Sequence, residues 1–205
     1  MSSDMKDNNG VSVQGHIKIH DPESGKVYVQ KRNAIHYENM SLALAESLAN
    51  QGQGFIYEMS FGNGGTSVDP TGIITYLTPN STGTNSSLYN QTYSKIVDGN
   101  SVNNTDPARN FLEIRHVSGT NYTDILVSCL LDYGEPDGQE AFDTATDNQT
   151  SFIFDELGLR SRVKNDAGQG RLLTHVIFHP VQKSLNRLIQ IDYTVRIQSL
   201  SGGNA

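Results

Sequence analysis

A strict alternation of apolar and polar residues near the carboxyl end constrains the fold more than any other sequence feature. It lies between residues 187 and 198, where Ile189, Ile191, Tyr193, Val195 and Ile197 alternate with Gln190, Asp192, Thr194, Arg196 and Gln198. Successive side chains of a β-strand point to opposite faces of a sheet, so this pattern predicts a strand with one buried and one exposed face. A sheet of that kind needs a second layer to cover its apolar face.

Other segments have strand-like patterns, and one has the pattern of a helix. The strand segments are residues 16–20, 26–30, 55–61, 111–117, 124–131, 151–159 and 172–178. Residues 39–50 combine a polar cap with good helix formers, and Leu44 and Leu48 are four apart, which predicts one short amphipathic helix. About eight strands and one helix predict a mainly β fold, a two-sheet β-sandwich with one short α-helix and a long loop excursion.

The 205 residues fit one domain with flexible ends. We expect a flexible arm at residues 1–14, a single β-sandwich domain at 15–200 with a loop insertion at 62–110, and a flexible tail at 201–205. The insertion is rich in Gly, Asn, Ser and Thr, but residues 73–77 and 88–93 within it carry aliphatic and aromatic side chains. A loop of this length in a compact domain usually has a function, so we expect these side chains to pack on something.

The charge and the apolar pattern argue against two classes of partner. The chain has 22 Asp and Glu residues against 15 Lys and Arg residues, so a sequence-independent grip on nucleic acid is not expected. No apolar stretch approaches the roughly 20 residues that cross a bilayer, and the first ten residues lack the apolar core of a signal peptide. We therefore expect no nucleic acid and no membrane as partner, and synthesis in the cytoplasm. Cys129 lies in an apolar run and is expected to be a buried, inert thiol.

The Gly-Asn-Gly-Gly sequence at residues 62–65 raises the question of a phosphate-binding loop. Such a loop needs a Lys-Ser/Thr pair or the dinucleotide spacing, and a following helix, whereas residues 66–70 read TSVDP. We interpret the glycines as serving backbone geometry, in a left-handed turn or a bulge at the end of a strand. Gly64→Ala is therefore expected to damage folding or assembly without removing any affinity for a ligand.

Two histidine pairs and an acidic segment have partial metal-site patterns. His16 and His20, like His175 and His179, are four residues apart, but in a strand this spacing spans about 13 Å, too far to share one ion. A metal site would need histidines from different strands. The acidic residues between 132 and 147 do not follow the order of an EF-hand loop, and no elbow motif marks a nucleophile. We expect no catalytic residue, no cofactor and no metal, and hence no enzyme.

Charges of opposite sign occupy two blocks of the second half. Residues 132–156 carry only acidic charges, whereas basic side chains outnumber acidic ones between residues 160 and 196. The two blocks pair either within one subunit or between neighbouring copies in a ring or sheath.

The order of several short motifs resembles a known family. These motifs are Asn33-Ala34-Ile35, Leu44-Ala45 with Leu48-Ala49, Met59-Ser60-Phe61-Gly62-Asn63-Gly64-Gly65, Leu88-Tyr89 with Tyr93, Asp155-Glu156-Leu157-Gly158-Leu159, Gly170-Arg171-Leu172-Leu173, Phe178-His179-Pro180 with Lys183, and the final strand ending Tyr193-Thr194-Val195. Over about residues 30–198, the series resembles the N-terminal domain of tail-collar fibre proteins of tailed phages, and related small virion proteins of marine and cyanobacterial phages. Two departures stand out: Arg160 replaces the family's aromatic residue, and no long shaft follows, so we expect this chain not to be the fibre itself.

The resemblance implies a non-enzymatic structural component of a tailed-phage virion, a tail or baseplate adaptor that anchors a fibre or a neighbouring ring. The implied partners are other copies of the chain and other virion proteins of the tail, baseplate, fibre or neck, and the implied location is the virion, assembled in the host cytoplasm. We expect the subunit contacts at aromatic and aliphatic residues of the polar insertion. The alternative is that these side chains pack on their own domain. These residues are Tyr76, Leu77, Leu88, Tyr89 and Tyr93.

Other functions stay open at this point. The protein is alternatively a neck or head-decoration protein, or a carbohydrate-binding module that recognises a receptor. A metal-dependent hydrolase that uses histidines of different strands is the remaining alternative.

Overall fold

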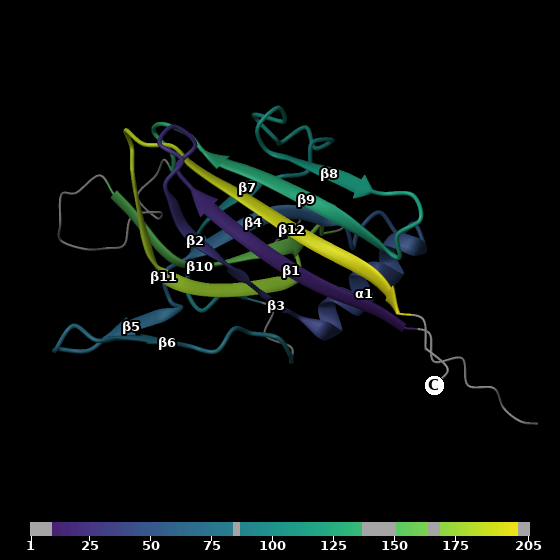
Figure 1. Cartoon of the computed structure of the whole chain (residues 1–205), viewed down its shortest axis with the longest axis horizontal. Coiled ribbons are helices and arrows are strands. Elements are labelled where there is room, and N and C mark those ends of the chain that lie inside the picture. Colours follow the sequence, from purple (N-terminus) through teal and green to yellow (C-terminus); the bar gives the residue numbers. More distant parts are fainter. Residues whose placement is uncertain (1–9, 84–86, 137–150, 164–168, 201–205) are drawn as a thin grey trace, which may run out of the picture.

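Two five-stranded antiparallel sheets form the body of the protein, with a helix at one end and a small hairpin below (Figure 1). The computed structural model describes residues 10–83, 87–136, 151–163 and 169–200. The first sheet has the order β2-β1-β12-β9-β8, the second β3-β11-β10-β4-β7, and β5 pairs only with β6. The elements are β1 (Gly10–His20), β2 (Val27–Arg32), β3 (Ala34–Ile35), α1 (Tyr37–Leu48), β4 (Ile56–Gly62), β5 (Thr66–Val68), β6 (Ile74–Tyr76), β7 (Gln91–Ile96), β8 (Phe111–His116), β9 (Tyr122–Leu131), β10 (Ser151–Ser161), β11 (Thr174–Ser184) and β12 (Ile189–Leu200). The predicted mainly β sandwich with one helix is confirmed.

The core lies between the two sheets and follows the alternation of β12. Ile189, Ile191 and Tyr193 are fully buried, while the polar residues between them are partly exposed. The second sheet faces them with a group of aromatic rings in which Phe61 and Phe154 meet edge to face, with centroids 5.4 Å apart. The strand predicted at residues 187–198 therefore has the buried face that its pattern indicates.

The first strand begins earlier than the sequence indicated. β1 starts at Gly10, because β12 continues to Leu200 and pairs with β1 along its whole length, from Gly10 opposite Leu200 to His20 opposite Gln190. Residues 10–14 of the predicted arm are thus part of a central sheet. Residues 1–9 and the predicted tail at 201–205 lie outside the described residues.

The insertion at residues 62–110 contains regular structure. Its first part forms the β5–β6 hairpin, and its second part forms β7, which pairs with β4 and completes the second sheet. The strand was missed because only Tyr93 and Ile96 of its six residues are large and apolar.

The helix is present, but only one of the two leucines that predicted its apolar side packs against the core. It begins at Tyr37, where the Nδ1 atom of His36 accepts a hydrogen bond from the Asn39 N–H at 3.3 Å. Met40 and Ala43 are buried, whereas Leu48 is 90% exposed. The buried residues of the helix are Asn39, Met40, Ala43 and Glu46, and Leu44 is partly buried against the core, so of the two leucines only Leu48 lies outside the packed side. No helix among the described residues is long and apolar enough to cross a bilayer.

Lysine side chains join the two sheets at both open sides of the sandwich. Lys31 of β2 donates to the Ile177 carbonyl of β11 at 2.7 Å, and Lys95 of β7 donates to the Leu130 carbonyl of β9 at the same distance. These two hydrogen bonds link the sheets across the open sides of the core.

Candidate functional site

Two consecutive carboxylates of β10, Asp155 and Glu156, lie in the interior and hold the insertion against the body. Asp155 is 3% exposed and Glu156 is fully buried. The register between β10 and β11 breaks between Phe154 and Glu156, which allows neighbouring side chains to serve the same segment. A buried carboxylate is costly unless its oxygens are hydrogen-bonded, so their partners decide what this site does.

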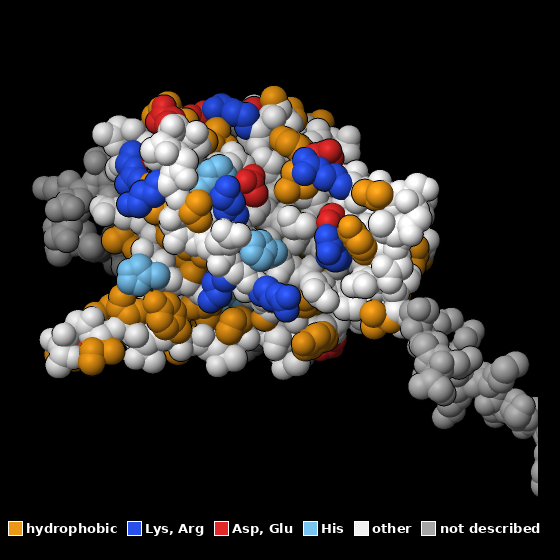
Figure 2. All heavy atoms as spheres, viewed as in Figure 1, with side chains coloured by type: hydrophobic (Ala, Val, Ile, Leu, Met, Phe, Trp, Pro, Cys, Tyr) orange, Lys and Arg blue, Asp and Glu red, His pale blue; other side chains and the backbone are white. Residues whose placement is uncertain are grey.

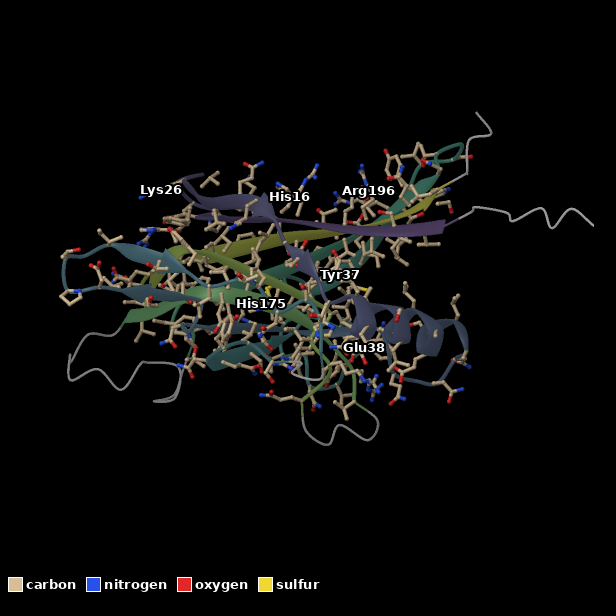
Figure 3. All side chains as sticks on the ribbon, turned by 90° about the horizontal axis from the view of Figure 1, so that it is seen from below. His16, Lys26, Tyr37, Glu38, His175 and Arg196 are labelled. Atoms are coloured by element: carbon tan, nitrogen blue, oxygen red, sulfur yellow. The ribbon has the colours of Figure 1, made fainter. Side chains whose placement is uncertain are left out.

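Both oxygens of Glu156 accept two hydrogen bonds each. One oxygen accepts the N–H groups of Gly64 at 3.1 Å and Asn90 at 2.8 Å, and the other accepts the Tyr89 N–H at 3.0 Å and the His175 Nε2–H at 2.9 Å. The ring of His175 is fully buried in the molecule and is labelled in Figure 3. The Nδ1 atom of this ring accepts the Asn80 N–H at 2.8 Å, which assigns the proton to Nε2 and makes the imidazole neutral.

Asp155 binds the next part of the same turn. Its oxygens accept the N–H of Gly65 and the N–H of Thr66, both at 2.9 Å, and the Thr66 hydroxyl donates to it as well. The successive N–H groups of residues 64–66 are therefore all engaged by carboxylates of the same chain. A run of backbone N–H groups is a favourable place for an anion, and in this turn the anion is internal.

The two carboxylates titrate in opposite directions. Burial raises the pKa of Asp155 above its usual 3.8, and the hydrogen bonds from Thr66 and Gly65 offset this only in part. Burial also acts to raise the pKa of Glu156, but the hydrogen bonds from His175, Asn90 and Tyr89 outweigh it and leave that pKa below 4.5. Glu156 is thus the better satisfied anion of the pair.

The glycines of the turn are required by close approach of the chain. A Cβ atom on Gly62 would lie 2.4 Å from the Asn90 carbonyl oxygen, and one on Gly64 would lie 2.7 Å from the Asn90 nitrogen. None of Gly62, Gly64 and Gly65 has a positive φ, so the predicted left-handed turn is wrong. The predicted bulge is confirmed, because the register between β4 and β7 shifts between Phe61 and Gly62.

The structure divides the five predicted contact residues into two groups. Tyr76, Leu77 and Tyr89 are 50%, 40% and 45% exposed. Leu88 is 5% exposed, and the ring of Tyr93 packs beside Phe61 and Phe152 in the aromatic group of the core. Leu88 and Tyr93 therefore pack on their own domain. A subunit contact in this region would use the exposed residues Tyr76, Leu77 and Tyr89 and their neighbours.

The β5–β6 hairpin adds exposed apolar side chains to this surface. Val68 and Ile73 are 62% and 63% exposed, and Figure 2 shows a band of apolar side chains along the lower edge of the molecule, where Figure 1 places the hairpin. We call Val68, Ile73, Tyr76 and Leu77 the hairpin surface. The Leu77 N–H donates to the Gly65 carbonyl at 2.9 Å, which joins this surface directly to the turn held by Asp155.

An open pocket of about 470 Å³ lies elsewhere, beside the start of β4. Its lining is Phe55, Asp98, Asn100, Ser101, Val102, Leu112 and Arg162. Asp98 is 7% exposed and accepts the Asn100 N–H at 3.0 Å, while the Arg162 guanidinium lies over the Phe55 ring, 5.8 Å from its centroid. An aromatic ring beside carboxylate, amide and hydroxyl groups matches the mixed apolar and polar surface of a sugar.

The remaining predicted site residues lie apart from one another. His16 is on β1 of the first sheet and His175 is in the interior beside Glu156 (Figure 3). Within the described ranges, no group of three or more His, Cys, Asp or Glu side chains is placed to hold a metal ion. Cys129 is fully buried and burial raises the pKa of its thiol to about 12, so the inert reading is confirmed. The acidic residues at 137–147 lie outside the described residues.

Some charged residues of the acidic and basic blocks have hydrogen-bond or ion-pair partners within the subunit. Lys183 donates to the carbonyl oxygens of Asp132 and Glu135, at 2.9 and 2.7 Å. Arg196 forms two hydrogen bonds with Asp124, and the carboxylate of Asp132 pairs with Arg109. Arg109 and Asp124 lie outside the two blocks, and Lys183 binds backbone oxygens, so direct pairing of the acidic block with the basic block stays a prediction.

Comparisons with protein-family models, curated proteins and solved structures gave no match for this chain.

Proposed function

We propose that the chain is a non-enzymatic structural component of a tailed-phage virion, an adaptor of the tail or baseplate that anchors a fibre or a neighbouring ring. One observation carries the proposal: a hairpin with an exposed apolar surface is fixed to the sandwich by two buried carboxylates, Asp155 and Glu156. A projecting element that must present apolar side chains in a constant position benefits from such an anchor. The motif order that resembles tail-collar fibre proteins supplies the virion context.

The hairpin surface has the composition expected of a contact with another protein. It combines an aromatic side chain, Tyr76, with the branched side chains of Val68, Ile73 and Leu77, all at least 40% exposed. The register of the hairpin sets Thr66 opposite Tyr76 and Val68 opposite Ile74, so Val68 and Tyr76 share one face. Exposed apolar side chains on one face of a polar hairpin mark an interaction site, and a tyrosine can serve as its anchor. The partner in this proposal is a neighbouring protein of the tail or baseplate.

The test is incorporation of variants into the particle. Ile73→Ser with Tyr76→Ser is expected to keep the fold and to reduce the amount of the chain in purified virions about tenfold or more, measured by quantitative mass spectrometry. Leu48→Ser is the matched control, because Leu48 is 90% exposed at the end of α1. Equal incorporation of the hairpin variant and the control would contradict the role of the hairpin.

Imaging separates the positions within the virion. Electron cryomicroscopy of the particle is expected to place the chain at the tail or baseplate. Density at the neck or on the head would replace the adaptor with the neck or head-decoration alternative, and absence of the chain from purified particles would overturn the virion assignment.

The pocket beside β4 favours a second candidate, a carbohydrate-binding module that recognises a receptor. Phe55 would supply an apolar face, and Asp98, Asn100 and Ser101 would supply hydrogen bonds to hydroxyl groups. A glycan array tests it: binding that Phe55→Ala removes would support this candidate, and a blank array with the wild-type protein would exclude it.

A further inference from the structure

β8 is an edge strand, and its sequence is complementary to a second, antiparallel copy of the same strand. Among the described residues, β8 ends the first sheet and pairs only with β9, so within that part of the chain its other side has no strand opposite. Glu113, Ile114 and Arg115 are all exposed, Ile114 by 74%, and Val117 just beyond the strand by 62%. An exposed edge with large apolar side chains is a template for pairing with another strand.

At the other edge of the same sheet, β2 has a side-chain contact with the second sheet. Strand β2 lies against the second sheet, where its Lys31 donates to the Ile177 carbonyl of β11. In Figure 1, β8 lies at the opposite side of the first sheet, along the upper border of the molecule. The first sheet can therefore be extended at β8.

We propose that β8 pairs antiparallel with β8 of a second copy, across a two-fold axis that passes Ile114. In this register Ile114 lies opposite Ile114 of the second copy, Glu113 lies opposite its Arg115, and Arg115 lies opposite its Glu113. Cross-strand neighbours lie on the same face, so the symmetric contact contains two ion pairs on one face and an isoleucine pair on the other.

Neighbouring registers lack this complementarity. An axis at Glu113 would place two glutamates opposite each other, and an axis at Arg115 would do the same with two arginines. Like charges directly opposite each other destabilise a strand pair. Within the subunit the Arg115 guanidinium already lies 2.7 Å from the Glu113 carboxylate, so both side chains are on the outer face and close to their proposed partners.

The contact rests on the proposed function, because an adaptor is present in several copies. It specifies the surface through which two copies meet. It differs from the hairpin surface, which is assigned to another virion protein. The self-association needs no other component, so its test is independent of incorporation into particles.

The test uses charge reversals and light scattering of the purified full chain, over concentrations up to about 1 mM because one strand pair buries less than a standard interface. Wild type is expected to dimerise with increasing concentration. Glu113→Arg alone places arginine opposite arginine at both pairs, and Arg115→Glu alone places glutamate opposite glutamate, so each is expected to weaken dimerisation about tenfold or more.

Mixing the two single variants is the decisive measurement. In a heterodimer of Glu113→Arg with Arg115→Glu, both cross-strand pairs again join opposite charges, so an equimolar mixture is expected to dimerise about as well as wild type. The double variant Glu113→Arg/Arg115→Glu is expected to do the same. Arg32→Glu, a reversal on the opposite edge strand, serves as the control and should not change dimerisation.

Three results would overturn the proposal. They are a wild-type monomer at the highest concentration, single variants that dimerise as tightly as wild type, and a mixture of the two singles that stays monomeric. Circular dichroism and thermal unfolding of each variant distinguish a lost contact from a lost fold, and the rescue on mixing requires both variants to be folded.

Discussion

The Glu156 carboxylate accepts hydrogen bonds from three separate segments, at Gly64, at Tyr89 and Asn90, and at His175. Glu156→Gln replaces one oxygen by an NH₂ group that faces two of these donors. We expect the free energy of unfolding to fall by about 2–4 kcal/mol, because buried donors lose their acceptor. Denaturant unfolding measures it, with the exposed Glu23→Gln as a control that should stay within about 0.5 kcal/mol of wild type.

The same carboxylate gives the protein an acid sensitivity with a definite sign. Its pKa is below 4.5 in the folded state, so its contribution is present above about pH 4.5 and is lost as the pH falls through the folded pKa. Asp155, with its pKa raised above 3.8, acts in the opposite direction, since it takes up its proton more readily in the folded state. The difference in unfolding free energy between wild type and Glu156→Gln is expected to shrink below pH 4.5. A constant difference would contradict this.

Lys183 provides a second pH effect, on the alkaline side. Its side chain is 1% exposed, and its ammonium group donates to the carbonyl oxygens of Asp132, Glu135 and Ser184. Burial lowers its pKa from 10.5 to about 8, so the unfolded chain binds more protons than the folded one between these values. The stability of wild type relative to Lys183→Met is expected to rise with pH over this interval. Thermal unfolding at several pH values measures this difference, and a flat pH profile of it would count against the prediction.

Gly64→Ala tests the close approach at the turn. The new Cβ atom would lie 2.7 Å from the Asn90 nitrogen and 2.8 Å from the Tyr89 Cβ, so the segment that Glu156 holds must move. We expect a loss of about 1–3 kcal/mol in unfolding free energy. Gly99→Ala is the matched control, since its Cβ atom would meet nothing closer than 3.9 Å. If both variants are equally stable, close approach is not what requires glycine.

The sequence predicted the role of a residue where one local property decides that role. The apolar run around Cys129 indicated its burial, and the motif at residues 62–65 indicated a bulge. The role of Asp155 and Glu156 had no local signal, because two adjacent carboxylates in a strand resemble any exposed acidic pair. Their partners come from residues 64–66, 89–90 and 175, and only the folded chain brings these together.

At the scale of elements, the hairpin is expected to be dispensable for the fold. Replacing residues 68–74 by Asn-Gly would close a two-residue turn between Ser67 and Thr75, which are paired in the structure. Val68 and Ile73 are largely exposed, so the unfolding free energy should change by no more than about 1 kcal/mol. Incorporation into particles is expected to fall, as with the double serine variant. Loss of the fold would show instead that the hairpin is part of the core.

Long elements with a regular pattern were predictable, and elements defined by their partners were not. β12 follows its alternation from Ile189 to Val195. β1 begins at Gly10 because β12 offers a partner there, and β7 exists because β4 has a free side. β11 extends through Pro180, beyond the predicted end, since β3 covers only Thr174 and His175 and leaves the edge at the proline unpaired.

At the scale of the whole molecule, amide hydrogen exchange is expected to follow the order of the strands. Amides of β12 and β10, which have neighbours on both sides, should exchange most slowly, and those of the β5–β6 hairpin and of β8 most rapidly. Raising the protein concentration should slow exchange in β8 alone if two copies pair there. Slowing in the hairpin instead would indicate that copies meet through the hairpin surface.

For the virion component proposed above, the carboxylates at the turn have a consequence when the particle leaves its cell. A loop ordered by a dissolved ion or nucleotide loosens when that molecule is diluted away, because occupancy follows the free concentration. Here the anions are the Asp155 and Glu156 side chains of β10, so the chain itself fixes their local concentration at the turn. The hairpin would keep the same orientation in dilute buffer and in cytoplasm near neutral pH, because its order does not depend on a dissolved ligand.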